Sequence, residues 1–255
     1  MQGINVRQIL KVWGGILAVM TLACATTETE KIPVYEPTFE KVKTQPGEKV
    51  DIAVAIVDPQ FSDSASSYYS FIRDQDAVGW RMVQTLKSSF SDILISKGFN
   101  TTGPFGSRDE MAYPQKKQVA FAVYPKFDMN PRVKVADKRT FTDTNAFGEE
   151  EQKTTCKLEL AGRGSIKIEA VETLSGQKLW FKNIDIETPK ESYPAKNENC
   201  VTAPSRWPTE LLNTWNRMHE TIYNKAIAAF KKYIHVKEFE NIKKNAMEVR
   251  EKTRF

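Results

Sequence analysis

The chain has 255 residues, of which 40% are hydrophobic and 27% charged, and its formal net charge is +5. This length and composition suit a single globular domain and exclude a disordered chain, a polytopic membrane protein and a collagen-like repeat. Three cysteines are too few for a disulfide-dense scaffold. The mild basic excess does not predict a nucleic-acid partner, because such proteins carry a much denser basic surface.

The N-terminal residues have the pattern of a bacterial lipoprotein leader. Arg7 and Lys11 precede an apolar run that is too short to cross a bilayer, which takes a helix of ~20 residues. The run ends in Leu22, Ala23 and Cys24, the pattern of a lipobox, in which the cysteine thiol is acylated and the peptide is cut just before it. We therefore predict lipidation of Cys24 and a membrane anchor of two or three acyl chains.

This leader sets the expected domain organisation. Ala25 follows the cysteine, and the absence of Asp at that position favours the outer membrane over retention in the inner membrane. The next residues are polar and rich in proline, which predicts a tether. We expect a lipoprotein signal peptide at residues 1–23, a lipidated N-terminus and tether at 24–49, and a single α+β domain with a basic C-terminal helix at 50–255.

Apolar periodicity predicts the elements of that domain in chain order. A polar link through Tyr68 and Tyr69 should lead from the first strand to the first helix, and the hydrophilic residues 137–155 should form a long projecting loop or a hairpin tip. The expected elements are an interior strand at 50–57, a helix from Asp76 to Gly98, an edge strand at 99–105, strands at 118–124, 132–135 and 157–160, a hairpin at 163–171 and 178–186, and a helix from Leu211 that continues weakly to Val249. The expected fold class is α+β, a mostly antiparallel sheet with one central and one long C-terminal helix packed on one face.

Cys156 and Cys200 form an even pair once Cys24 is lipidated. Disulfides persist in the exported compartment that the leader implies, so we predict a bond between them. The alternative is that both are merely small core or loop residues, because a sequence does not show whether their Cα atoms approach.

Motifs for catalysis are missing from the sequence. His219 and His235 are the only histidines, and neither lies in a His-Glu-x-x-His arrangement or near a cysteine pair. Glu149 to Glu151 lack the spaced oxygen ligands of a calcium loop and suggest a solvated charge run. We therefore predict no enzymatic activity, no cofactor and no metal site; a hydrolase would need a pocket with paired carboxylates or a histidine with an acid partner.

Binding features are richer. Aromatic side chains in polar segments can stack on sugars or on partner side chains, and they are Tyr68, Tyr69, Phe71 and Trp207. Lys138, Arg139 and Thr140 supply two cations and a hydroxyl that can engage a carboxylate such as that of a sialic acid. From Lys231 onward the chain has eight Lys or Arg residues and four Glu residues. This basic excess is either a solvated helical face or a surface that contacts lipid phosphates or acidic envelope polymers.

Several of these features together resemble one family. They are the lipobox at Cys24, the run from Leu86 to Phe99 with Lys97-Gly98-Phe99, the segment Asp137-Lys138-Arg139-Thr140, the hairpin from Ile166 to Ile186 with Leu174-Ser175-Gly176 at its turn, and the Lys/Glu-rich C-terminal helix. The chain resembles the neuraminyllactose-binding haemagglutinins, also called flagellar sheath adhesins, from about Val50 to Arg254. This resemblance implies an outer-membrane lipoprotein, associated with the surface or the flagellar sheath, for which binding to sialylated host glycans has been proposed.

The proposed sialic-acid motif of that family is Lys-Arg-Thr followed by Ile-Gln-Lys. Lys138, Arg139 and Thr140 match its first half, but Phe141, Thr142 and Asp143 depart from the second. An acid therefore replaces the third basic group, which weakens the attraction to an anionic sugar there.

Two functions follow as hypotheses. The first is an outer-membrane lipoprotein that acts as an adhesin-like binding module for sialylated glycans. The alternative is a periplasm-facing accessory or structural lipoprotein that docks on an envelope or flagellar complex through its C-terminal helix.

Overall fold

The computed structural model describes residues 32–43, 45, 47–187, 191–195, 200 and 207–253. The predicted signal peptide and Cys24 lie outside these residues. Residues 34–255 cluster as one compact unit, separate from residues 1–33. None of the helices within the described ranges has the length and apolar character needed to cross a membrane.

The unit contains both strands and helices, which confirms the α+β class. The strands are β1 (Ala53–Val57), β2 (Gln60–Phe61), β3 (Asn100–Phe105), β4 (Phe121–Met129), β5 (Arg132–Thr144), β6 (Glu150–Ala161), β7 (Arg163–Glu172), β8 (Lys178–Glu187) and β9 (Glu191–Ala195). The helices are α2 (Ser66–Asp74), α3 (Ala77–Ser96), α4 (Tyr113–Gln118), α5 (Thr209–Tyr233) and α6 (Val236–Thr253), with short 3-10 turns η1 (Asp63–Ala65) and η2 (Arg108–Glu110).

The main sheet is mixed: most of its paired residues are antiparallel, and the strands near β1 are parallel. Its order is β3-β1-β4-β7-β8, with β2 also paired to β4. β1 runs parallel to β3 and β4, whereas β7 runs antiparallel to β4 and β8. The parallel pairs arise because α3 and α4 lie in the connections between these strands and return the chain to the same end of the sheet.

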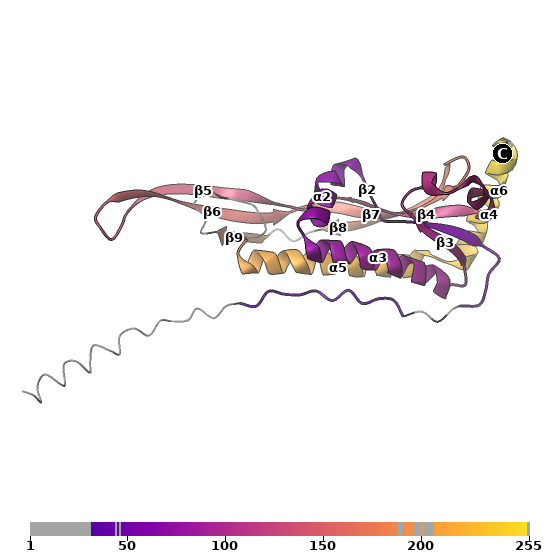
Figure 1. Cartoon of the computed structure of the whole chain (residues 1–255), viewed down its shortest axis with the longest axis horizontal. Helices are drawn as coiled ribbons and strands as arrows, with labels where there is room; N and C mark the ends of the chain where they lie inside the picture. Colours follow the sequence, from indigo (N-terminus) through magenta and orange to yellow (C-terminus); the bar gives the residue numbers. More distant parts are fainter. Residues whose placement is uncertain are drawn as a thin grey trace, which may run out of the picture. The chain divides into compact units, whose positions relative to one another are not determined.

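Helices α3 and α5 lie side by side along one face of the main sheet (Figure 1). The predicted stripe on α3 is buried there: Met82, Leu86, Phe90 and Ile93 are all at most 2% exposed. Asp76 caps this helix as expected, because its Oδ1 accepts a hydrogen bond from the Gly79 N–H at 2.9 Å. The sequence pattern thus predicted this layer correctly.

The C-terminal helix is a pair of helices and not the single long helix expected. Ile234 between them is fully buried and has an extended backbone. This break turns α6 so that Phe239 packs on the sheet, with its ring centroid 5.2 Å from that of Phe121 and 5.0 Å from that of Phe99. At its far end, Arg250 Nε donates to the buried carboxylate of Glu172 at 2.7 Å and holds α6 on the turn after β7.

Part of the predicted tether packs on the domain. The Tyr35 N–H donates to Asn213 Oδ1 at 2.6 Å, and the Tyr35 hydroxyl donates to Glu220 at 2.5 Å. Further along, the Tyr223 hydroxyl donates to the carbonyl of Glu40, and the Phe39 ring lies against Tyr223. These contacts fix the segment 34–43 along α5, so the compact unit begins before residue 50.

The second sheet has the order β5-β6-β9 and is antiparallel. β5 and β6 form a long hairpin that extends beyond the main sheet (Figure 1). The hydrophilic stretch at 137–155, expected as a projecting loop or hairpin tip, is the outer part of this hairpin, and most of it is strand. Most side chains on both faces of this outer part are exposed, so its sequence does not show the alternation of apolar and polar residues by which a strand is predicted.

Candidate functional site

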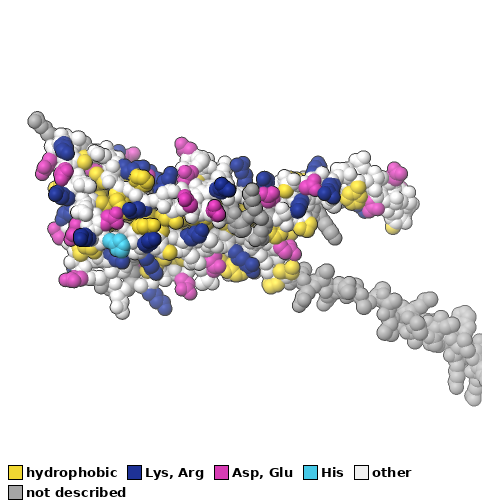
Figure 2. All heavy atoms as spheres, turned by 180° about the vertical axis from the view of Figure 1, so that it is seen from behind, with side chains coloured by type: hydrophobic (Ala, Val, Ile, Leu, Met, Phe, Trp, Pro, Cys, Tyr) yellow, Lys and Arg dark blue, Asp and Glu magenta, His cyan; other side chains and the backbone are white. Residues whose placement is uncertain are grey.

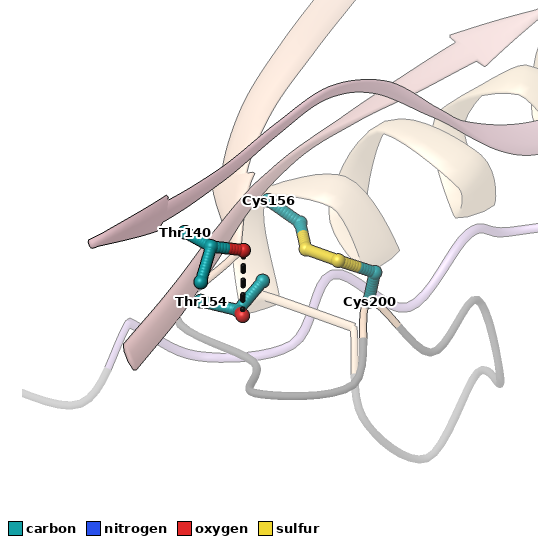
Figure 3. The surroundings of a disulfide bond; sticks show 4 residues. All are labelled: Thr140, Thr154, Cys156 and Cys200. Atoms are coloured by element: carbon teal, nitrogen blue, oxygen red, sulfur yellow. Dashed lines mark hydrogen bonds between the residues drawn. A yellow bond between two sulfur atoms is a disulfide. The ribbon is translucent and has the colours of Figure 1, made fainter. Parts of the chain in front are cut away.

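The predicted ligand residues Lys138, Arg139 and Thr140 lie on β5 and are exposed. Because side chains alternate along a strand, Lys138 and Thr140 point to one face of the hairpin and Arg139 to the other. The Arg139 Nε donates to Asp137 Oδ2 at 3.0 Å, on its own face. Thr140 forms a hydroxyl–hydroxyl hydrogen bond of 3.3 Å with Thr154 (Figure 3). The three side chains therefore do not converge on one ligand.

The predicted disulfide lies next to this pair of threonines. Cys156 on β6 is bonded to Cys200, and their Cα atoms are 5.5 Å apart (Figure 3). Cys156 is 4% exposed, so the bond ties the root of the hairpin to the connection that follows β9. Lipidation at Cys24 stays a prediction.

The structure places a different group of residues around a pocket, which we call the aromatic pocket. It has a volume of about 260 Å³. Its lining residues are Ser67, Tyr68, Phe71, Asn130, Pro131, Arg132, Val133, Trp207 and Trp215. The first three come from α2, the next four from the β4–β5 connection and the start of β5, and the last two from α5 and the residues before it. These segments are far apart in sequence and meet only in the fold.

Three rings of the aromatic pocket pack on one another. The centroid of Phe71 lies 6.2 Å from that of Trp207, in a stacked arrangement, and 5.5 Å from that of Trp215. Trp207 and Trp215 meet edge to face at 5.2 Å. Such contacts fix ring orientation, so this wall is rigid before any ligand arrives.

A buried polar group holds the wall from behind. Trp215 Nε1 donates to Asp76 Oδ2 at 2.7 Å, and His219 Nε2 lies 3.5 Å from the same oxygen. The His219 ring stacks on Tyr68 and meets Trp215 edge to face. Burial lowers the pKa of His219 to about 4, although the charge of Asp76 acts in the opposite direction. At neutral pH the wall is therefore backed by an uncharged imidazole.

A second depression adjoins the aromatic pocket, and we call it the basic hollow. Its volume is about 550 Å³, and its lining residues are Asn130, Arg132, Lys134, Ala161, Gly162, Arg163 and Glu187. Asn130 and Arg132 line both cavities and thus stand at their boundary. Three cations against one acid make the hollow attractive to anions.

The basic hollow exists because the chain passes from one sheet to the other here. Pro131 joins β4 to β5, and Gly162 joins β6 to β7. The two connections touch: a Cβ at Gly162 would lie 2.7 Å from the Cα of Pro131. Any larger residue would push them apart, so Gly162 is required for the approach that positions Arg132 and Arg163.

Arg132 and Arg163 are exposed, and neither forms an ion pair with another residue in the described part of the chain. Lys134 is less available, since its ammonium lies 3.6 Å from Glu159. An unpaired guanidinium can bind a carboxylate with two parallel hydrogen bonds. Next to it, flat aromatic rings offer the apolar contact that the C–H face of a sugar ring makes.

Sequence reasoning identified part of this site. Tyr68, Phe71 and Trp207 stood out as aromatic residues in polar segments, and all three line the aromatic pocket. Trp215 was expected in the core and is both buried and part of the lining. Arg132 was missed, because an exposed arginine at the start of an alternating strand has no distinguishing local pattern.

Two cations of the basic C-terminal tail are paired within the domain. Lys243 Nζ pairs with Asp51 at 3.1 Å and Arg250 with Glu172, while Glu238 accepts from Trp180 Nε1 at 2.6 Å. On the face shown in Figure 2, Lys and Arg side chains are interspersed with Asp and Glu and form no single basic patch. In the described ranges, no group of three or more His, Cys, Asp or Glu side chains is arranged to hold a metal ion.

Comparison with known proteins identifies a likeness in structure only. No protein-family model and no curated protein matches the sequence. A Helicobacter pylori crystal structure, named as a homolog of neuraminyllactose-binding haemagglutinin, matches with a TM-score of 0.52 and 14% identity over 84% of this chain and 100% of that one. At this identity the match shows a shared fold.

Two other solved structures match more weakly. A Xanthomonas campestris protein of the family DUF330 has a TM-score of 0.33 and 8% identity, over 77% of this chain and 93% of that one. The PelC dodecamer of Paraburkholderia phytofirmans has a TM-score of 0.19 and 9% identity, over 72% of this chain and 95% of its own. We draw nothing from these two matches.

Proposed function

We propose that this chain is a lipid-anchored, adhesin-like binding module of a bacterial outer membrane, and that it binds acidic glycans such as sialylated sugars without catalysis. The observation that carries this proposal is the position of Arg132. It lies between a pocket walled by aromatic rings and a hollow that holds further cations. A sialic acid combines a sugar ring with a carboxylate, and this site offers a partner for each.

The binding mode follows from the geometry. The ring of a terminal acidic sugar packs on Phe71 and Trp207, and its carboxylate accepts hydrogen bonds from Arg132. The aromatic pocket, at about 260 Å³, is of the size of one sugar ring, so the remaining sugars extend into the basic hollow. The shared fold with a protein named as a homolog of neuraminyllactose-binding haemagglutinin supports the same ligand class.

Binding of monovalent sialyllactose to the Arg132→Ala variant tests the site. A charge-assisted hydrogen bond contributes ~1.5–3 kcal/mol, so we expect the affinity to fall at least tenfold, measured by calorimetry. Trp207→Ala should weaken binding as well, through lost stacking.

The matched control is Arg139→Ala, which removes an exposed arginine from β5 outside the site and should leave the affinity unchanged. Loss of binding with Arg139→Ala but not with Arg132→Ala would move the site to Lys138, Arg139 and Thr140. Binding that survives both substitutions would place the glycan at another site, and a wild-type chain that does not bind sialyllactose would contradict the glycan proposal.

The anchor is proposed from the leader alone, with cleavage before Cys24 and acylation of its thiol. We expect mass spectrometry of the mature chain to find acylated Cys24 at its N-terminus, and Cys24→Ser to release the domain from the membrane fraction. A bare thiol or an uncut leader in the native protein would contradict the anchor.

A second candidate is a periplasm-facing accessory lipoprotein that docks on an envelope or flagellar complex. The observation that favours it is the β5–β6 hairpin, which extends beyond the main sheet and carries two exposed aromatic residues, Phe141 (46% exposed) and Phe147 (89% exposed). Protease treatment of intact cells separates the two candidates. Degradation supports display at the surface, whereas full protection contradicts the adhesin and supports the accessory role.

A further inference from the structure

Strand β5 forms an unusually long free edge. It occupies one end of the order β5-β6-β9, so among the described strands it pairs with β6 alone. The strand has 13 residues, and its outer N–H and C=O groups form a template for another strand. Proteins usually shorten, cover or interrupt such an edge, and the single irregularity here, between Val135 and Asp137, leaves the outer part regular.

The outer half of the hairpin also lacks a third strand. β9 pairs with β6 only from Cys156 to Leu160, and the disulfide lies at the same level. Between Thr155 and the hairpin tip, the described chain forms a ribbon of two strands, β5 and β6. Such a ribbon is at most marginally stable in water. Another strand added to β5 would stabilise it by completing its hydrogen bonds.

The sequence of this edge is complementary to itself. When two copies of β5 lie antiparallel with Phe141 opposite Phe141, Arg139 lies opposite Asp143 at both ends of the pairing and Thr140 lies opposite Thr142. Arg139, Phe141 and Asp143 share one face, because side chains alternate along a strand. The exposed fractions of their side chains are 79% for Arg139 and 49% for Asp143, and Phe141 is 46% exposed as a residue.

We propose that two copies of this chain pair through the outer part of β5 and form a continuous sheet, β6-β5-β5-β6, around a two-fold axis at Phe141. This interface is independent of the proposed glycan site. Two Arg139–Asp143 pairs flank a central aromatic contact, and each kind of cross-strand pair is stabilising in antiparallel sheets. Because the contact is isologous, it closes as a dimer and does not propagate into a fibre.

Charge disfavours two alternative registers. A pairing centred on Arg139 would oppose two guanidinium groups, and one centred on Asp143 would oppose two carboxylates; like charges directly opposite are destabilising. Lys153 lies opposite Phe141 on β6 and already donates to Asp143 at 2.7 Å. Each Asp143 would then have one cation from its own chain and one from the partner copy.

Cysteine cross-linking of the full chain in membranes tests the geometry. Residues opposite each other in a sheet have Cβ atoms ~4.5–5.5 Å apart, near enough for a disulfide after small adjustment. We expect Phe141→Cys to give a covalent dimer on mild oxidation. The control is Phe147→Cys at the hairpin tip, which is more exposed but distant from the axis and should stay monomeric. Equal cross-linking at both positions, or none at residue 141, would overturn the proposal.

Charge exchange provides a second test that keeps Phe141. Arg139→Asp places two acids opposite each other at both ends of the pairing and should weaken the dimer at least tenfold, measured by sedimentation of the full chain in detergent. Adding Asp143→Arg to that variant restores the pairs and should restore dimerisation.

Lys138→Asp is the matched control, because Lys138 lies on the other face opposite Thr144 and should have little effect. A monomeric wild-type chain, or a double variant that fails to recover, contradicts the proposed interface. Neither result bears on monovalent glycan binding, so the two proposals fail separately.

Discussion

Asp76 shows how one residue can connect local structure to a binding wall. It caps α3 through the Gly79 N–H and accepts a hydrogen bond from the indole of Trp215. Gly79 has no space for a side chain, since a Cβ there would lie 2.8 Å from Asp76 Oδ2 and 3.0 Å from His219 Cε1. The helix cap, the glycine and the buried histidine are therefore needed together to orient Trp215 in the aromatic pocket.

The buried His219 makes stability depend on pH. Its pKa in the fold is about 4, because burial disfavours the imidazolium, whereas an unfolded chain titrates near 6.5. As pH falls from 6.5 toward 4, protons bind the unfolded chain first, so the free energy of unfolding decreases. This site should contribute a loss of about 2 kcal/mol between pH 7 and pH 5, measured by urea unfolding.

His219→Gln supplies the comparison, because it removes the titrating group and keeps a polar side chain. The variant should lose less stability than the wild type over the same pH range. An equal loss in both proteins would show that His219 is not the group responsible, and that carboxylates such as Glu172 dominate.

At the scale of elements, the disulfide joins strand β6 to the connection that follows β9. β9 has five residues, and Cys200 follows it by a few positions. The bond to Cys156 fastens this connection to β6, the strand that carries the hairpin away from the main sheet. Cys200 lies in the chain between the short strand β9 and helix α5, and α5 supplies Trp215 to the aromatic pocket.

Loss of this bond should lower stability substantially. The two cysteines are 44 residues apart, and a cross-link over that length stabilises by about 4 kcal/mol in the chain-entropy description. We expect a reducing agent to lower the denaturant midpoint of the wild type and to leave the Cys156→Ala/Cys200→Ala variant unchanged. A double variant that responds to the reductant as strongly as the wild type would refute this.

For the whole molecule, stability should decrease from the main sheet toward the hairpin tip. β4 and β7 pair over nine residues in the centre of the sheet, and the side chains that face the helices are fully buried. The outer hairpin has exposed side chains on both faces and, within the described strands, no third partner. Few buried contacts make local opening easy, so different parts of one chain should open with different free energies.

Hydrogen exchange measures this gradient directly. Amides of β4 and β7 should exchange slowest, and those of residues 140–154 should exchange orders of magnitude faster in a dilute monomer. If two copies pair through β5, the outward-facing amides near Phe141 should become protected as the concentration rises, while those of β6 at the same level change little. Uniform protection along the hairpin at all concentrations would contradict the gradient.

Local patterns in the sequence were enough for several elements. The strand that ends at Val57 is a continuous apolar run that is buried on both faces, and the helix capped by Asp76 buries one apolar face with a helical period, so both can be read directly from the sequence. The β7–β8 hairpin was read from two apolar segments on either side of a turn with Gly176. The short helix α2 was missed because its nine residues include three serines, which suggest a turn. The inner ends of β5 and β6 were predicted from their alternation, whereas the outer part of the hairpin could not be told from a loop, because neither of its faces is buried and hydrophobic alternation is absent there.

The sequence by itself determined the α+β class, the main buried faces, the cysteine pair and the aromatic residues worth attention, because each depends on neighbours along the chain or on composition. Only the tertiary structure decided the mixed order of the sheet, the break between α5 and α6, and the meeting of Phe71, Arg132 and Trp215 at one pocket. Those outcomes depend on which distant segments pack together, and the free energy of that packing has no signature within any single segment.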